Sequence, residues 1–233
     1  MHFFVNNEYK VIFGWSGKCG CSHIKKIYYF LCNNTDKEIH NDDEYEEELP
    51  HDIQEYTCIL FIRNPYKRLV SGFLDKYSKS GIYINNFLLK YDRIKFDTFI
   101  DELIIGDWSI IDEHHFTPQT TEQFNKTKII KSKSLIIYDI ENINYKYLEK
   151  LFNRNIPCEL INFKGGHERK VYDDFFDGDY VYNLDINEYI KYNVPINKFY
   201  NKDLKDKVYN FYVNDFLFFK ESGFDYNNNL LIN

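Results

Sequence analysis

One segment near the N-terminus, residues 14–25, most constrains how this chain can fold. It is rich in glycine and joins the apolar, β-prone stretch Tyr9–Phe13 to a region, Ile24–Leu31, where apolar residues recur at helical spacing. The turn therefore ends at a helix N-terminus, where backbone N–H groups and the positive end of the helix dipole favour a phosphate or sulfate. Lys18 adds a positive charge. The segment predicts an anion-binding turn, with an ordinary strand-to-helix turn as the alternative.

The spacing of this turn differs from that of the nucleoside triphosphate loop. That loop has four residues between its first glycine and a Gly-Lys-Ser/Thr ending. Here only Trp15 and Ser16 separate Gly14 from Gly17, and Cys19 follows the lysine. The sequence therefore keeps the phosphate-binding interpretation and weakens an ATPase interpretation.

A second strand-to-helix switch follows further along the chain. Thr57–Ile62 is a continuous apolar run of strand length, and Arg63 stands where it ends. Asn64 is a good helix cap, and Pro65 suits the first helical turn. The apolar residues that follow at helical spacing predict a core stripe made of Tyr66, Leu69, Val70, Phe73, Leu74 and Tyr77.

The other side of this helix is more polar and carries Arg68, Ser71 and Asp75. Because ligands gather at the carboxyl ends of parallel strands, Arg63 and Ser71 could converge on one anion beside the first turn. The alternative is that Arg63 pairs with a carboxylate and Ser71 faces solvent.

Taken together, Lys18–Ser22 and Arg63–Ser71 resemble two motifs of the carbohydrate sulfotransferases of the membrane-associated (Golgi) type. Two further pieces match in the right order. His115–Gln119 is similar to the family's His-Trp-x-Pro-Gln element, and Val208–Phe219 is similar to its closing helix. The resemblance spans about residues 10–224, nearly the whole chain.

The departures from the family pattern are small. Gly17 stands where the family commonly has proline, and Phe116 replaces the usual tryptophan, so a turn and an aromatic wall are kept. Lys164–Lys170 falls where relatives have a less regular cofactor-contacting loop, and its assignment is poor.

The resemblance implies a three-layer, P-loop-like α/β fold with a mostly parallel central sheet flanked by helices. It also implies a sulfuryl donor, 3′-phosphoadenosine 5′-phosphosulfate (PAPS), which leaves as PAP. In the family the first motif holds the 5′-phosphosulfate and the second holds the 3′-phosphate. The donor-binding residues that follow from the resemblance are Gly17, Lys18, Cys19, Gly20, Cys21, Ser22, Arg63 and Ser71.

Sulfuryl transfer to a hydroxyl of a carbohydrate or related small acceptor defines the expected catalytic roles. Lys18 would neutralise charge on the leaving oxygen, in an in-line displacement analogous to phosphoryl transfer that needs no metal. A general base must take the acceptor's proton, and a neutral imidazole can do so at neutral pH. We expect His115 to be this base, with His114 and Glu113 as competitors.

Composition narrows the class of protein further. A chain of 233 residues with 44% hydrophobic content suffices for one catalytic domain, residues 1–233. The net charge of −7 opposes a general nucleic-acid binder. The chain has five cysteines, an odd number, which fits a reducing compartment. Cys19 and Cys21 have no second cysteine pair downstream, so we expect them in packing or loop roles rather than on a metal.

We also expect a soluble, cytoplasmic protein without a membrane segment. Family members in animals usually sit in the Golgi behind a membrane anchor, but Met1–Glu8 is too short and polar for a signal or anchor. No run of about 18 apolar residues occurs in the chain. No oligomeric state is predicted.

The rest of the chain gives a coarse outline. We expect helices at Phe96–Ile105, ended by Gly106, and at Tyr145–Phe152, a strand at Ser134–Tyr138, and a loop carrying the base at Asp107–Gln119. Asp42–Glu48 is expected as a solvated acidic insertion. Asn153–Asn201 should form loops, short helices and part of the acceptor cleft, and Lys202–Phe219 should form one aromatic-rich helix.

Two other functions stay open at this point. A P-loop-like nucleotide kinase using ATP and magnesium would use Asp139, after a strand, to hold the metal. A degenerate relative would bind nucleotide or glycan without turnover.

Overall fold

The computed structural model describes residues 1–32, 49–78, 81–120, 126–163 and 172–226. It divides into two compact units, each of which is described by itself. The first contains residues 1–63 and 119–168, and the second contains residues 64–118 and 169–233. The interpretation of the chain as one catalytic domain stays a prediction. The acidic run Asp42–Glu48 and the segment Lys164–Lys170 lie outside the described residues.

The first unit is built on a four-stranded sheet with the strand order β1-β2-β3-β4. Strands β2, β3 and β4 are parallel, and β1 adds an antiparallel edge beside β2. Its strands and helices are β1 (His2–Asn6), β2 (Val11–Trp15), α1 (Cys21–Leu31), η1 (Ile53–Glu55), β3 (Thr57–Ile62), α6 (Lys126–Ile130), β4 (Ser134–Asp139), α7 (Tyr145–Phe152) and α8 (Cys158–Ile161). The predicted α/β class and mostly parallel sheet flanked by helices are confirmed.

The strand boundaries show where local patterns were insufficient. Strand β2 begins at Val11 and runs to Trp15, two residues later at each end than Tyr9–Phe13. The sequence pattern does not predict the edge strand His2–Asn6. It exists through pairing with β2, in which Phe4 lies opposite Phe13.

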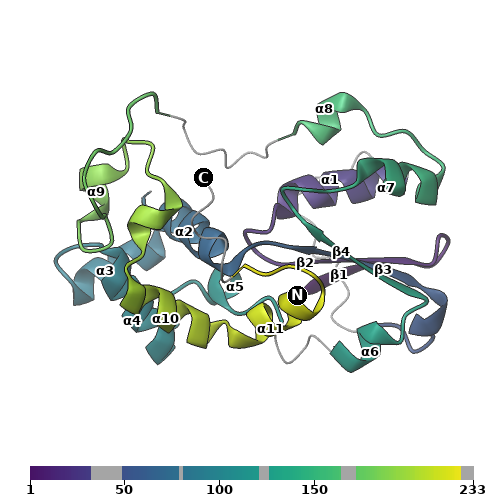
Figure 1. Ribbon diagram of the computed structural model, residues 1–233, viewed down its shortest axis with the longest axis horizontal. Helices are drawn as coiled ribbons and strands as arrows, with labels where there is room; N and C mark the ends of the chain where they lie inside the picture. The colour runs from purple at the N-terminus through teal and green to yellow at the C-terminus, as the bar shows by residue number, and fades with distance from the viewer. Residues whose placement is uncertain (33–48, 79–80, 121–125, 164–171, 227–233) are drawn as a thin grey trace. The chain divides into compact units, whose positions relative to one another are not determined.

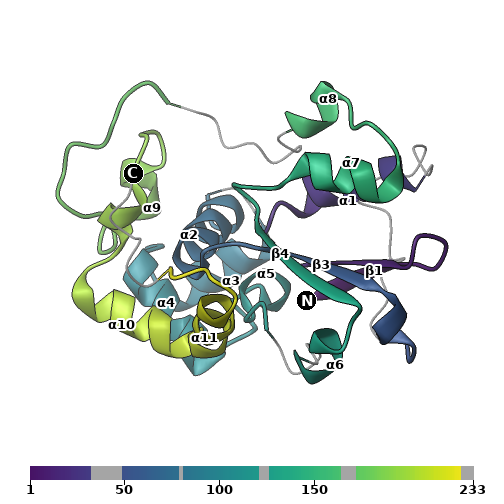
Figure 2. The same ribbon diagram turned by 45° about the vertical axis from the view of Figure 1, so that its right-hand side comes forward.

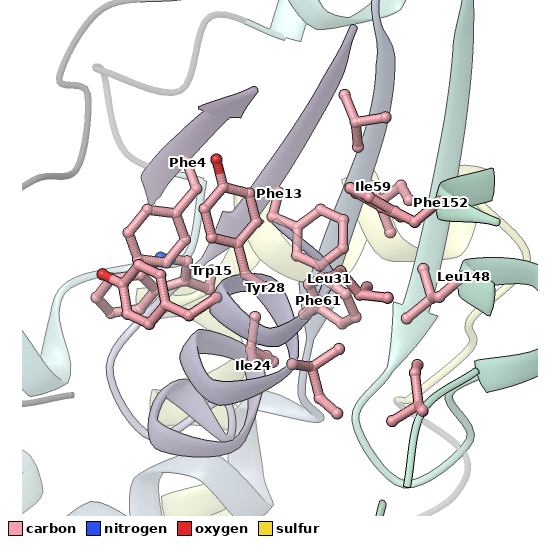
Figure 3. Close-up of a cluster of buried hydrophobic side chains, with 14 residues drawn as sticks. Phe4, Phe13, Trp15, Ile24, Tyr28, Leu31, Ile59, Phe61, Leu148 and Phe152 are labelled. Carbon is pink, nitrogen blue, oxygen red and sulfur yellow. The ribbon is translucent and has the colours of Figure 1, made fainter. Parts of the chain in front are cut away.

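Helices α1 and α7 lie side by side on one face of the sheet, and α6 lies on the opposite side near the start of β4 (Figure 1 and Figure 2). A buried aromatic and aliphatic cluster fills the space under α1 and α7. Figure 3 shows its main members, which are Phe4, Phe13, Trp15, Ile24, Tyr28, Leu31, Ile59, Phe61, Leu148 and Phe152. The predicted apolar stripe of α1 is part of this core. Burial of this stripe therefore holds α1 in place, and with it the turn from which the helix starts.

The second unit is helical. Its elements are α2 (Pro65–Lys76), α3 (Ile82–Lys90), α4 (Phe96–Ile105), α5 (Glu113–Phe116), α9 (Ile186–Tyr189), η2 (Ile196–Phe199), α10 (Lys202–Phe211) and α11 (Val213–Glu221). Helices α4 and α10 lie side by side (Figure 1). The predicted helix at Phe96–Ile105 has the bounds expected, and Gly106 ends it with a left-handed φ of 79°. The predicted helix at Tyr145–Phe152, α7 of the first unit, also has the bounds expected.

Helix α2 begins as its sequence predicts. The side chain of Asn64 accepts a hydrogen bond from the N–H of Tyr66 at 2.9 Å, and Pro65 occupies the first turn. All six residues of the predicted stripe are buried. The placement of Arg68 on a polar face was wrong: its side chain is 2% exposed, because its guanidinium donates to the carbonyl of Thr117 at 2.8 Å. Ser71 and Asp75 are half-buried.

The single closing helix expected at Lys202–Phe219 is two helices. The backbone leaves helical geometry at Tyr212, where φ is −101° and ψ is 24°. Tyr212 is buried, and its hydroxyl donates to the carbonyl of Phe116 at 2.6 Å. A helical pattern in the sequence does not reveal such an interruption, because it coincides with a contact to a residue 96 positions away.

Candidate functional site

The turn between β2 and α1 has two residues in the left-handed region. Lys18 has a φ of 63° and Gly20 has a φ of 68°. For glycine this conformation costs little, but for a lysine it costs about 1–2 kcal/mol. The N–H of Cys19 donates to the carbonyl of Ser16 at 3.1 Å and closes the turn. A strained lysine held by its surroundings is an observation that points to function.

The start of α1 is suited to an anion. Gly20, its N-cap, has no side chain to bond the first N–H groups, and the first turn contains no acidic residue. The N–H groups of this turn and the helix dipole therefore present positive potential to a ligand. Ser22, in the same turn, is buried.

Arg63, the first residue of the second predicted motif, contacts this turn. It follows the last residue of β3, and its Nη1 donates to the carbonyl oxygen of Lys18 at 3.0 Å. The guanidinium is therefore tied to the backbone of the strained lysine. The alternative that Arg63 pairs with a carboxylate stays a prediction.

Gln119 completes the network and has no exposed surface. Its Oε1 accepts from the backbone N–H of Arg63 at 3.0 Å, and its Nε2 donates to the carbonyl of Arg63 at 2.9 Å. The same Oε1 accepts from the thiol of Cys19 at 2.9 Å. Cys19, fully buried, therefore packs in the turn, as expected for this cysteine.

His23, one residue after Ser22, links α1 to its surroundings in the first unit. Its Nδ1 lies 2.9 Å from the carbonyl of Phe163, and its Nε2 lies 2.9 Å from the hydroxyl of Tyr145. A carbonyl accepts only, so Nδ1 carries the proton and the Tyr145 hydroxyl donates to Nε2. Burial lowers the pKa of His23 below 6.5, although the hydrogen bond to the Phe163 carbonyl acts in the opposite direction.

The second unit contains the predicted base. His115 lies in the short helix α5, and its Nδ1 is 2.8 Å from Oδ2 of Asp112. A carboxylate accepts only, so Nδ1 carries a proton, and in the neutral ring the lone pair lies on Nε2. Lys76 lies 3.6 Å from the same carboxylate oxygen. This is the arrangement of a general base with an orienting carboxylate.

The charge of Asp112 is maintained by its neighbours. Burial acts to raise the pKa of its carboxyl, but the hydrogen bond from His115 and the charges of His115 and Lys76 outweigh burial, so the pKa lies below 3.8. Asp112 is therefore an anion at neutral pH.

The backbone around His115 is fixed by three buried side chains of the same unit. The hydroxyl of Tyr77 donates to the carbonyl of Ile110, that of Tyr212 donates to Phe116, and Arg68 donates to Thr117. Phe116 packs in the core, with its ring centroid 4.9 Å from that of Phe99. Its expected role as the aromatic wall of a site stays a prediction. His114 and Glu113, the competing bases, have exposed side chains and do not make the bond to Asp112 that His115 makes.

The structure thus groups the predicted residues in two sets. The turn residues Gly17–Ser22 and Arg63 are brought together in the first unit. Ser71, on α2, and His115 belong to the second unit. Sequence reasoning missed Asp112 and the hydrogen bonds of Gln119. An aspartate three residues before a histidine was the available signal for Asp112.

The other candidates have plainer surroundings. Oδ1 of Asp139 accepts from the N–H of Glu141 at 2.8 Å and so stabilises the turn after β4. Within the described residues, no group of three or more His, Cys, Asp or Glu side chains is placed to hold a metal ion. Among these same residues, no helix has the length and hydrophobicity of a membrane span.

Comparisons with known proteins agree with the two motifs. A model described as the sulfotransferase family matches residues 1–224. Carbohydrate sulfotransferase 8 of Mus musculus and that of Homo sapiens are each 31% identical over 94 residues, which cover 34% of this chain and 22% of the relative. Carbohydrate sulfotransferase 14 of Mus musculus is 24% identical over 139 residues, 48% of this chain and 37% of the relative.

The matches therefore span about a fifth to about two-fifths of the relatives' length. No solved structure matches the chain significantly. The family match covers nearly all of the sequence, and it confirms the resemblance inferred from the motifs. The chain belongs to the sulfotransferase family.

Proposed function

We propose that this protein transfers a sulfuryl group from PAPS to a hydroxyl of a carbohydrate or related small acceptor. One observation carries the proposal. In this member of the sulfotransferase family, the turn before α1 combines Lys18 in a left-handed backbone conformation, a helix N-terminus and the side chain of Arg63. PAPS supplies the activated sulfuryl group when it is bound. The carbohydrate acceptor is favoured by the names of the relatives, which are carbohydrate sulfotransferases.

The residues of the turn fit the donor's anionic groups. The N–H groups at the start of α1 and the hydroxyl of Ser22 hold the 5′-phosphate end. Lys18 neutralises negative charge on the leaving oxygen. Arg63 and Ser71 hold the 3′-phosphate, and the binding energy gained there fixes the orientation of the reacting atoms.

His115 acts as the general base. Its Nδ1 donates to Asp112, so Nε2 is the atom that takes the proton from the carbohydrate hydroxyl as the new S–O bond forms. Asp112 holds this tautomer and stabilises the imidazolium that results.

The test is transfer of radiolabelled sulfate from PAPS to a panel of glycans and small alcohols. Wild type should label at least one acceptor, and Lys18→Ala and His115→Ala should lose about 100-fold or more of the rate. Lys131→Ala and His51→Ala, at exposed positions of the first unit, are the matched controls and should keep it. His115→Ala should still bind PAP. No labelled acceptor, or full rates in the Lys18 and His115 variants, would contradict the proposal.

A further inference from the structure

The side chain of Gln119 is buried and makes three hydrogen bonds with the donor turn and the end of β3. Two of them go to the backbone N–H and carbonyl of Arg63, so the amide pairs with this residue as a neighbouring strand would. The third goes to the thiol of Cys19. Both lone pairs of Oε1 are thereby used.

The orientation of this amide is determined by its partners. Oε1 faces an N–H and Nε2 faces a carbonyl, and a flipped amide would place N–H against N–H and oxygen against oxygen. A flipped amide would therefore lose both bonds to Arg63 in a fully buried position, where an unsatisfied polar group is costly.

The contacts form a closed ring. Gln119 binds the backbone of Arg63, the guanidinium of Arg63 binds the carbonyl of Lys18, and Cys19, the next residue, binds Gln119. The peptide bond between Lys18 and Cys19 is part of this ring, and it directly follows the residue with the left-handed φ, Lys18. Such a backbone conformation persists only where surrounding contacts determine it.

We propose that Gln119 is a positioning residue of the donor site, which acts through Arg63 and Cys19 to hold Lys18 in its left-handed conformation. The sulfuryl donor is the ligand of the proposed function, on which this inference rests. Without Gln119 the turn relaxes toward ordinary backbone geometry, and both Lys18 and Arg63 lose their alignment.

Two readouts test this role. The first needs no donor: amide hydrogen exchange across residues 16–22 and at residue 63 of the full chain. The second is the dissociation constant of PAP, measured by calorimetry. Gln119→Ala should speed exchange in these segments and weaken PAP binding about tenfold or more.

A second pair of variants keeps the test valid if Gln119→Ala does not fold. Cys19→Ala removes one bond of the ring, whereas Cys19→Ser keeps a hydroxyl donor at that position. Cys19→Ala should raise exchange and the PAP dissociation constant more than Cys19→Ser does. Equal effects of the two would contradict the role of the thiol bond.

Asn144→Ala is the matched control. The side chain of Asn144 also accepts a hydrogen bond from a backbone N–H in the first unit, that of Tyr147 at 3.1 Å, at the exposed start of α7. It should change neither readout at residues 16–22. Unchanged exchange and unchanged PAP affinity in a folded Gln119→Ala would overturn the inference, as would an equal effect of Asn144→Ala.

The two proposals fail in different ways. Wild type that does not bind PAP, while Gln119→Ala still speeds exchange at residues 16–22, would refute the donor and keep the positioning of the turn. If Gln119→Ala binds PAP as tightly as wild type does, and its amide exchange at residues 16–22 equals that of wild type, only the role of Gln119 is refuted.

Discussion

Nδ1 of His115 lies 2.8 Å from Oδ2 of Asp112, three residues earlier in the chain. This bond determines which ring nitrogen carries the proton. In the neutral ring it leaves the lone pair on Nε2, the state that a general base needs. In the proposed function, Asp112 is the residue that orients His115 as the base.

Asp112→Asn should lower kcat by about 100-fold or more, because the amide no longer fixes the tautomer and no longer stabilises the imidazolium. The dissociation constant of PAP should stay near that of wild type. Steady-state sulfate transfer and calorimetry measure the two quantities. Asp101→Asn, at an exposed aspartate of the same unit, is the control. A kcat close to wild type in Asp112→Asn would remove Asp112 from the mechanism.

Gly20→Ala tests the left-handed backbone at the start of α1. The added Cβ would lie 3.8 Å from Ile140, an ordinary contact, so the cost comes from φ alone. We expect a loss of about 1–2 kcal/mol in the free energy of unfolding, measured in urea. Gly81→Ala is the control, because its φ is 179° and nothing lies within 4 Å. Equal effects at the two positions would refute the backbone explanation.

Gly72→Ala tests the close packing of α2 against the segment that carries His115 and Phe116. A Cβ at this position would lie 2.5 Å from Cε1 of Phe116, whose ring is 1% exposed. The ring has little room to move, so we expect a destabilisation of about 1–3 kcal/mol. Phe116→Leu should partly offset the loss in the double variant, since it removes the clashing atoms. Strictly additive losses in the double variant would show that the two residues do not meet.

The lowered pKa of His23 predicts how stability depends on pH. The folded state binds this proton less readily than the unfolded state, so stability falls as pH drops below about 6.5 and is constant with respect to this group above it. Urea unfolding at about pH 7.5 and about pH 5 should show a smaller difference in His23→Gln than in wild type. His51→Gln, at an exposed histidine, should behave like wild type. An unchanged pH dependence in His23→Gln would contradict the shift.

Local patterns predicted the parts of the fold that depend on neighbours in the sequence. Asn64 and Pro65 mark the start of α2, and the periodic apolar residues of α1 and α2 are buried as expected. The glycine spacing and Lys18 located the turn. These signals act over one or two helical turns, which is the range that a sequence pattern reports.

The missed features all depend on long-range contacts. Gln119 reaches residues 56 and 100 positions away, and Arg68 is buried because it binds a carbonyl 49 positions away. Strand β1 exists through pairing with β2, and Tyr212 interrupts a helix where it binds Phe116. Helical periodicity places Arg68 on a polar face, but it contains no information about such partners.

The most direct test of the central claim is calorimetry of the full chain with PAP and, separately, with ATP plus magnesium. The account predicts that PAP binds at least about tenfold more tightly than ATP with magnesium, and that Arg63→Ala loses about tenfold or more of the PAP affinity. Tighter binding of ATP with magnesium, or PAP affinity unchanged in Arg63→Ala, would contradict it.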